Sequence, residues 1–270
     1  MKLQKTSFLG IAGIVLISAL HLGVPQSKPL QFEVASVKPN ASGDHRIMMQ
    51  ITAGGRLNVT GASLRDLIRT AYGIEDFQII GGSAWISSER WDIQAKAEEN
   101  VLQSQVTEML QSLLAERFQL KFHKESRRLP VYELVIARNG PKLQESKPNA
   151  NGDGHNAGPR QSHGAGGHAG GRAMTMAQLA QMLSVTVDRT VLDKTGLAGT
   201  YDITLSWRPE PGQGRSFGNH MPPGGALPAS DPGLPSIFTA VQDQLGLKLE
   251  AARGPVDVIV IDSAQKPTQQ

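Results

Sequence analysis

Short strands and amphipathic helices alternate along this chain. Strands are predicted where apolar and polar residues alternate, as they do from Phe32 to Val37 and from Trp91 to Ala97. Helices are predicted where apolar residues recur at helical spacing, and the first of them follows the N-cap residue Ser63 and stops at Gly73. The inward apolar residues of the predicted helices are Leu64, Leu67, Ile68 and Ala71; Val106, Met109, Leu110, Leu113 and Leu114; Met176, Leu179, Ala180 and Leu183; and Ile237, Val241 and Leu245.

Each half of the chain ends in a pattern that predicts a β-hairpin. In the first half, the strands Gln119 to His123 and Val131 to Ala137 are joined by a basic connection from Lys124 to Leu129. In the second half, the corresponding strands are Leu247 to Ala251 and Val256 to Asp262.

Motifs of the first half recur in the second half. Trp91-Asp92-Ile93 recurs as Tyr201-Asp202-Ile203, 110 residues later. Two more matches lie 127 and 125 residues apart, and the change of offset falls at a Pro- and Gly-rich insertion. These are Leu120-Lys121-Phe122 with Leu247-Lys248-Leu249, and Pro130-Val131 with Pro255-Val256. We interpret the halves as related β-α-β-β-α-β-β units of the α+β class, with helices packed on small, mostly antiparallel sheets. The competing interpretation is that the halves share common strand sequences by chance.

The first residues resemble an export signal. Lys2 and Lys5 precede the apolar run from Phe8 to Val24, and a polar exit follows. Cleavage of this leader and its retention as a membrane anchor both stay open, because the run is marginal in length for spanning a bilayer. The predicted organisation is a signal peptide or anchor over 1–27, a first unit over 28–143, a Gly- and His-rich linker over 144–170, a second unit over 171–264 with a Pro/Gly loop over 208–234, and a tail over 265–270.

Composition excludes several classes of function. The 270 residues include no cysteine, which rules out disulfides, thiolate metal sites and a cysteine nucleophile. The formal charge is +3, and without Lys2 and Lys5 the chain carries 25 basic and 24 acidic residues. This near-neutral balance predicts no nucleic-acid partner, which would require a basic face. Any membrane contact is expected only through the N-terminal segment, if it is retained.

Sequence motifs for catalysis or metal binding are weak. No nucleophile elbow, phosphate-binding loop, dinucleotide fingerprint or calcium-loop pattern occurs. His155, His163 and His168 are weak metal candidates, but their spacing is not that of a helical or knuckle site, so we predict no metal and no cofactor. His123 with Glu125 could form an acid–base couple or simply end a solvent-exposed strand. Asp193-Lys194, beside Gly196, could form an acid–base pair, but turn chemistry alone explains both residues.

Candidate binding residues are aromatic or basic. Tyr72 and Trp85 could line a ligand groove, whereas Trp91 and Tyr201 are interpreted first as core anchors. The basic residues of the first predicted hairpin could meet an acidic partner, although a solvated hairpin explains them as well. They are Lys124, Arg127 and Arg128.

Several long motifs carry a family resemblance. They include FEVASVKPN, SLRDLIRTAYGI, LLAERFQLKFHKESRRLPVYELVIA, VLDKTGLAGTYDITLSW and QLGLKLE. With these motifs the chain resembles an uncharacterised family of exported proteins expanded in soil acidobacteria, over nearly everything after the leader except the two Gly- and Pro-rich segments. The same domain occurs in that family fused to membrane regulatory metallopeptidases of the antibiotic-sensor type. The resemblance implies an extracytoplasmic sensing or binding role and no catalytic residue, and this chain has no HExxH motif.

Each half also resembles, more weakly, the periplasmic N-terminal modules of secretins and TonB-dependent receptors, which implies protein docking. We therefore predict an exported, non-enzymatic binding or interaction module whose sheet edges accept an envelope protein. The alternative is a secreted hydrolase acting on an envelope or environmental polymer. A polar cleft joining His123 with Asp193 or Asp202 would favour the hydrolase, and a long free edge strand would favour docking.

Overall fold

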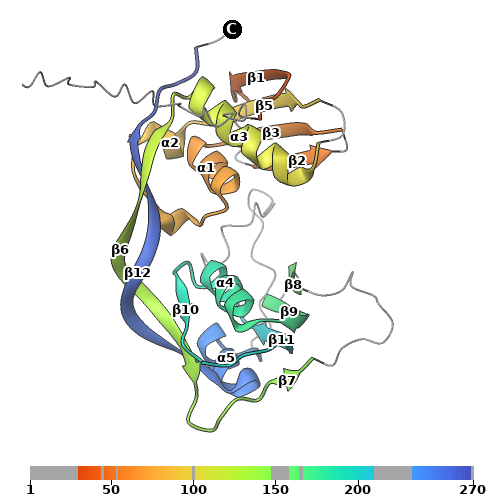
Figure 1. Ribbon diagram of the computed structural model, residues 1–270, viewed down its shortest axis with the longest axis vertical. Helices are drawn as coiled ribbons and strands as arrows, with labels where there is room; N and C mark the ends of the chain where they lie inside the picture. The colour runs from red at the N-terminus through yellow and green to blue at the C-terminus, as the bar shows by residue number, and fades with distance from the viewer. Residues whose placement is uncertain are drawn as a thin grey trace, which may run out of the picture.

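Two lobes joined by a long two-stranded ribbon make up the protein (Figure 1). The computed structural model describes residues 30–43, 46–52, 54–98, 101–146, 158–163, 167–209 and 233–268. The predicted leader and most of the Pro/Gly loop lie outside these residues. No helix within the described ranges is long and apolar enough to cross a membrane. The class is α+β, with helices packed on small, mostly antiparallel sheets, as the sequence predicted.

Lobe 1 holds a four-stranded sheet in the order β1-β5-β3-β2 and three helices. Helix α1 forms where predicted because Ser63 and Asp66 cap its start reciprocally and Gly73, with φ of 61°, ends it in the left-handed conformation. The short helix α2 was not predicted. The elements are β1 (Val34–Pro39), β2 (Met48–Thr52), β3 (Arg56–Ala62), α1 (Leu64–Tyr72), η1 (Asp76–Gln78), β4 (Ile79–Gly81), α2 (Trp85–Ser88), β5 (Trp91–Lys96) and α3 (Gln103–Arg117).

Lobe 2 holds a second four-stranded sheet, in the order β7-β11-β9-β8, and two helices. Thr175 and Gln178 form the capping box of α4, and Gly246 ends α5 in the left-handed conformation. The elements are β7 (Gln144–Glu145), β8 (Gly158–His163), β9 (Gly167–Met174), α4 (Met176–Thr186), β10 (Val191–Asp193), β11 (Tyr201–Trp207) and α5 (Ile237–Leu245).

The prediction of a structureless linker over 144–170 was wrong where the structure describes it. Strands β7, β8 and most of the glycine-rich part of β9 fall within that range and complete the sheet of lobe 2. The glycines that suggested a linker are packing positions, since a Cβ on Gly170 would lie 2.1 Å from the Ile203 carbonyl oxygen. A Cβ on Gly167 would likewise lie 2.3 Å from the Trp207 ring.

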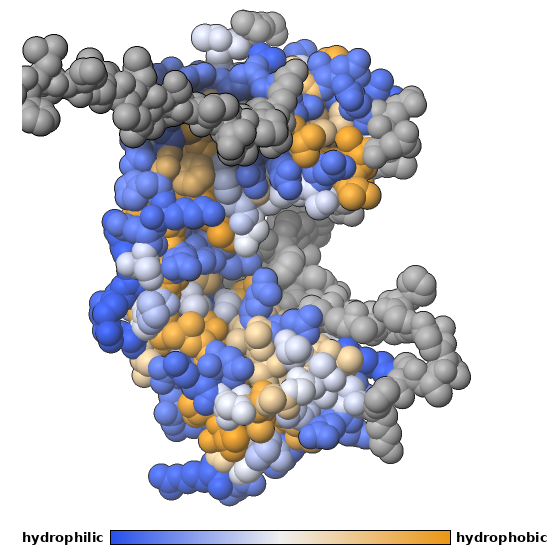
Figure 2. All heavy atoms as spheres, in the orientation of Figure 1, coloured by the Kyte–Doolittle hydropathy of each residue, from blue (hydrophilic) through white to orange (hydrophobic). Residues whose placement is uncertain are grey.

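The two predicted hairpins were also wrong, because each is one continuous strand. Strand β6 (Lys121–Ile136) and strand β12 (Leu247–Ser263) pair antiparallel along nearly their whole length and form the ribbon. The polar stretch from Lys124 to Leu129 resembled a turn, but it contains no Gly, Asn or Asp to form one. Most of its residues are exposed, whereas Val131, Val256 and Val258 form a small buried cluster on one face of the ribbon. Figure 2 shows hydrophilic side chains along the left side of the molecule, where the ribbon runs.

Each lobe adds one short strand to the ribbon. Strand β4 of lobe 1 pairs parallel with β12, and strand β10 of lobe 2 pairs parallel with β6, giving the order β10-β6-β12-β4. Leu134 of β6 joins the core of lobe 2, and Ile261 of β12 joins the core of lobe 1. The two sequence halves are therefore not separate bodies, because the long strand of each half crosses into the lobe of the other.

Apart from η1 and α2, which have no counterpart among the described residues of lobe 2, the lobes have the same order of elements. They also share a local hydrogen-bond arrangement. Asp92 of β5 accepts hydrogen bonds from Gly61 N and Asn40 Nδ2, at 2.9 and 2.7 Å. Asp202 of β11 accepts from Ala173 N at 3.1 Å and from the Ser146 hydroxyl. Origin of the lobes by internal duplication stays a prediction.

Candidate functional site

Where β6 runs through lobe 1, one of its edges pairs with no strand among the described residues. Tyr132 N donates to Thr190 O in the loop before β10, and Lys194 N donates to Leu134 O, both at 2.9 Å. The backbone groups of the even-numbered residues of β6 therefore point away from β12. Because backbone groups alternate along a strand, Phe122, Lys124, Ser126 and Arg128 present their backbone groups on the same side. β10 covers only residues 132–134 of β6, and no other described strand pairs with that side. We call these four residues the β6 edge.

The β6 edge ends at the centre of the ribbon. Pro130 occupies the next outward position and has no N–H to donate. Arg253 Nη2 donates across the ribbon to Arg128 O at 3.3 Å, and Arg128 Nη2 donates to Arg253 O at 3.2 Å. Proline and charged side chains are common means of blocking an edge strand. The unblocked part of the β6 edge therefore lies within lobe 1.

The predicted basic residues lie on this strand but not on one face. Lys124 and Arg128 point to the face of the ribbon that carries the helices, and Arg127 points to the opposite face. All three are exposed, and Arg127 forms an ion pair with Glu125. The cluster is thus a basic strand with both faces charged, rather than a single patch.

Two predicted binding residues, Tyr72 and Lys124, line the same pocket, which we call the ribbon pocket. It has a volume of about 400 Å³ and is also lined by Gln78, Ser126 and Asp257. The Tyr72 ring packs edge-on against Phe122 with centroids 4.8 Å apart, and burial raises the pKa of its hydroxyl above the ordinary value. The sequence did not identify Asp257 as a site residue, because it does not show that Asp257 pairs with Ser126 across the ribbon.

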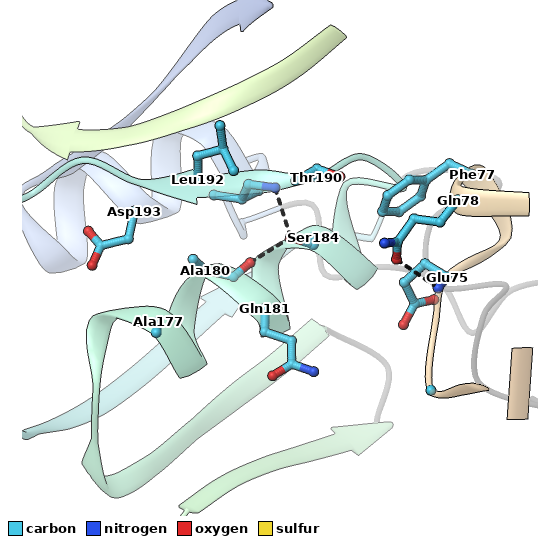
Figure 3. A pocket seen from close by; sticks show the side chains of 12 residues that line it. Glu75, Phe77, Gln78, Ala177, Ala180, Gln181, Ser184, Thr190, Leu192 and Asp193 are labelled. Atoms are coloured by element: carbon cyan, nitrogen blue, oxygen red, sulfur yellow. Dashed lines mark hydrogen bonds between the residues drawn. The ribbon is translucent and has the colours of Figure 1, made fainter. Parts of the chain in front are cut away.

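A second pocket, of about 300 Å³, lies between the lobes (Figure 3). Glu75 and Gln78 of lobe 1 line it together with α4 and β10 of lobe 2. The Ser184 hydroxyl is committed within lobe 2, since it donates to Ala180 O and accepts from Val191 N, both at 2.8 Å. Figure 3 places Asp193 and Glu75 at opposite sides of the pocket, so they form no carboxylate pair.

Asp193 has the role that turn chemistry gives it. Its carboxylate accepts hydrogen bonds from the backbone and hydroxyl of Thr195, at 2.9 and 2.7 Å. These bonds are local to the end of β10, as the turn interpretation of Asp193 expects.

His123 pairs more closely with Asp262 than with the predicted partner Glu125. His123 Nδ1 lies 2.8 Å from Asp262 Oδ1, whereas its Nε2 lies 3.9 Å from Glu125 Oε2. The His123 side chain is 53% exposed. Asp193 lines the pocket between the lobes and Asp202 lines a groove on the sheet of lobe 2. His123 lines neither of these two, so the three residues share no cleft there.

The aromatic candidates divide between core and surface. Trp91 and Tyr201 are 3% and 6% exposed, which confirms their interpretation as core anchors. Trp85 is partly buried against the core of lobe 1, and Lys266 Nζ lies 6.0 Å from its ring centroid. Trp85 does not line the ribbon pocket, so the structure does not bring it together with Tyr72.

Two of the three predicted histidines lie in the described residues, on the paired strands β8 and β9. His168 Nδ1 lies 2.8 Å from the Ser206 hydroxyl, and His163 pairs in register with Gly167. His155 lies outside the described residues. Among the residues that the structure describes, no three His, Asp or Glu side chains gather as a metal-binding group.

Asp202 lies in a groove of about 320 Å³ over β9 and β11. The hydroxyl of Ser146 and the N–H of Ala173 lower the pKa of its carboxyl, and Arg172, 4.0 Å away, adds to this effect. Sequence reasoning found Asp202 through its repeated motif but not Ser146, which lay at the start of the predicted linker.

The fold and these sites define a two-lobed α+β protein with surface pockets along a shared ribbon. Residues 65–264 match the model of the family described as "Protein of unknown function (DUF3738)", and the chain belongs to this family. No curated protein and no solved structure matches the chain. The family description assigns no activity, so function has to be argued from the chain itself.

Proposed function

We propose that this protein is an extracytoplasmic, non-catalytic binding module that docks an extended acidic segment of an envelope protein along the β6 edge. The observation that carries the proposal is a basic edge strand in lobe 1 that no other described strand pairs with. An extended segment adds to such an edge through backbone hydrogen bonds, while its side chains contact those of the edge strand.

Charge distinguishes this edge from its counterpart in lobe 2. The outward groups of β12 at Leu247, Leu249 and Ala251 are also unpaired among the described strands. Their surroundings are nearly neutral, and Lys248 Nζ donates to Glu250 Oε1 at 2.9 Å. Around the β6 edge, the sequence KFHKESRR has four basic residues and one acidic residue. An acidic segment is therefore favoured at β6 over β12.

Export rests on the sequence of the leader. A basic start followed by an apolar run and a polar exit supports function outside the cytoplasm. Docking at the cell envelope, with a sensing role, is consistent with that location.

The hydrolase alternative has one observation in its favour, the His123–Asp262 couple. An imidazole oriented by a carboxylate is a component of many hydrolytic sites. This couple is exposed on one side of the ribbon and lines neither the ribbon pocket nor the pocket between the lobes. Docking has the stronger support.

The test is capture of envelope proteins by the immobilised purified protein, measured by mass spectrometry against bare beads. Ser126→Pro removes an outward N–H of the β6 edge, and Ser126→Ala removes only the hydroxyl. Ala251→Pro makes the matching change on the β12 edge. We expect the wild type, Ser126→Ala and Ala251→Pro to recover one defined envelope protein, and Ser126→Pro to lose it.

A second pair of variants tests the charge argument. The double variant Arg127→Gln and Arg128→Gln should weaken capture several-fold and reduce its dependence on salt, because exposed charges act mainly through screened attraction. Lys248→Gln on β12 is the matched control. Recovery of the same protein by Ser126→Pro at wild-type yield, or no recovery above bare beads, would contradict docking at this edge.

A further inference from the structure

We propose that the ribbon pocket binds a free α-amino acid with an apolar side chain, holding its carboxylate at Lys124 and its ammonium group at Asp257. The pocket brings groups of opposite charge onto one face of the ribbon, from neighbouring strands. No ion pair within the described residues joins either Lys124 or Asp257 to another side chain. Both charges are therefore available to a ligand that carries the opposite charges.

The register makes the two charged residues neighbours across the ribbon. Lys124 lies opposite Ile259, and Ser126 lies opposite Asp257, so Lys124 and Asp257 are diagonal neighbours across the ribbon. Diagonal neighbours in an antiparallel pair are about 7–8 Å apart. The flexible lysine side chain lets both charged groups reach the adjacent carboxylate and ammonium groups of one small ligand.

Tyr72 provides a second group for the ligand carboxylate. Its ring is fixed edge-on against Phe122, and it lines the pocket together with Lys124. Burial raises the pKa of the hydroxyl, so Tyr72 stays a neutral donor at neutral pH. A neutral donor beside an ammonium group suits a carboxylate.

Asp257 is held in place for the ligand ammonium. Gln78 Nε2 donates to Asp257 O at 2.9 Å, and Gln78 Oε1 accepts from Glu75 N at 3.0 Å, which ties the strand to the wall of the pocket. The other acid of the pocket, Glu125, is already paired with Arg127. Asp257 is thus the carboxylate left for an ammonium group.

Size and apolar lining favour a small ligand with a hydrocarbon side chain. The volume of about 400 Å³ falls at the lower end of the range of about 300–1,000 Å³ for small-molecule sites. The Tyr72 ring and Ile74, both partly buried, provide apolar surface in the same pocket. Such a lining suits an aliphatic or aromatic amino acid better than a sugar.

The corresponding place in lobe 2 lacks these groups. Strand β4 sets Ile79 opposite Ile259, and β10 sets Val191 opposite Tyr132, so Ile259 and Tyr132 correspond. By the same correspondence, Lys124 is replaced by Ala251 and Asp257 by Pro130. Ligand binding is therefore expected in lobe 1 only.

Isothermal titration of the purified full chain with L-leucine and L-phenylalanine tests this inference. N-acetyl-L-leucine and L-leucinamide, each lacking one of the two charges, are the ligand controls. We expect measurable binding of the free amino acids, at least tenfold weaker binding of both blocked forms, and at least tenfold weaker binding to Lys124→Gln and to Asp257→Asn. Lys248→Gln, on the part of β12 that runs through lobe 2, should bind as the wild type does.

Because Lys124 and Asp257 are exposed, we expect both variants to fold, and circular dichroism checks this. If one of them fails to fold, Tyr72→Phe, which should weaken binding of the carboxylate several-fold, replaces it. No heat at millimolar amino acid, equal binding of the blocked forms, or unchanged binding to the folded variants would overturn the inference. The titration contains no protein partner, so its result is independent of the docking proposal.

Discussion

The two lobes are built alike but differ where they meet the ribbon. Each has a four-stranded sheet in the same order, a helix opened by a capping box, and an aspartate that ties three strands together. Lobe 1 presents a basic free edge and a pocket with opposite charges beside it. Lobe 2 presents a nearly neutral edge, and Arg189 stacks at 4.8 Å over Tyr132, the residue that corresponds to Ile259. The shared elements thus account for folding, and the differences along the ribbon point to function.

Truncation of the core anchors should have the largest effect. Trp91→Ala in lobe 1 and Tyr201→Ala in lobe 2 should each lower the free energy of unfolding by about 3–5 kcal/mol, as for other large-to-small aromatic changes in cores. Because β6 and β12 cross both lobes, both variants should shift one common transition in denaturant titrations followed by circular dichroism. Two transitions, with only one shifted by each variant, would show that the lobes unfold separately.

Removal of the Asp92 carboxylate, the lobe 1 counterpart of Asp202, should lower stability less. Asp92→Ala leaves Gly61 N and Asn40 Nδ2 without their acceptor, which should cost about 1–3 kcal/mol. Asp92→Asn keeps one acceptor oxygen and should lose less. Equal stability of the Ala and Asn variants in urea titrations would show that these hydrogen bonds do not hold lobe 1 together.

Proline scanning tests which residues of β6 face outward. Proline at Ser126 should change stability little, because this N–H has no partner in the described chain. Proline at Glu125, whose backbone faces β12, should destabilise by at least about 1 kcal/mol more through a lost ladder hydrogen bond. Thermal melts compare the two variants, and the reverse order would mean that the strand faces the other way.

The smallest expected effect is on the pH dependence of stability, through the pKa of Asp202. Ser146→Ala removes the largest cause of its lowered pKa, so the pKa of this carboxyl should rise toward the ordinary value. A pKa lowered by folding stabilises the native state above the ordinary pKa, and this stability is lost as the pH falls through the folded value. The variant should therefore lose less stability on acidification than the wild type. Carboxyl NMR titration measures the pKa directly, and an unchanged value would exclude the role of the Ser146 hydroxyl.

Local chemistry was predictable from the sequence, and long-range pairing was not. Helix α1 was predictable because Ser63 and Gly73 mark its ends with their own hydrogen bonds and backbone angles. The ribbon was not, because β6 pairs with β12, more than a hundred residues away, and a polar ribbon strand resembles a hairpin connection. Of the candidate site, Tyr72 and Lys124 were found as separate residues. Their meeting with Asp257 depends on the register, which the sequence does not reveal.

The most direct test of the free β6 edge is amide hydrogen exchange of the protein alone, resolved by residue with NMR. Outward amides without a partner should exchange fast, and amides that donate to another strand or to the loop before β10 should exchange slowly. We predict fast exchange at Lys124 and Ser126, with slow exchange at Glu125, which faces β12, and at Tyr132, which donates to Thr190 O. Exchange at Lys124 and Ser126 as slow as at Tyr132 would show that the edge is already occupied, and would contradict docking there.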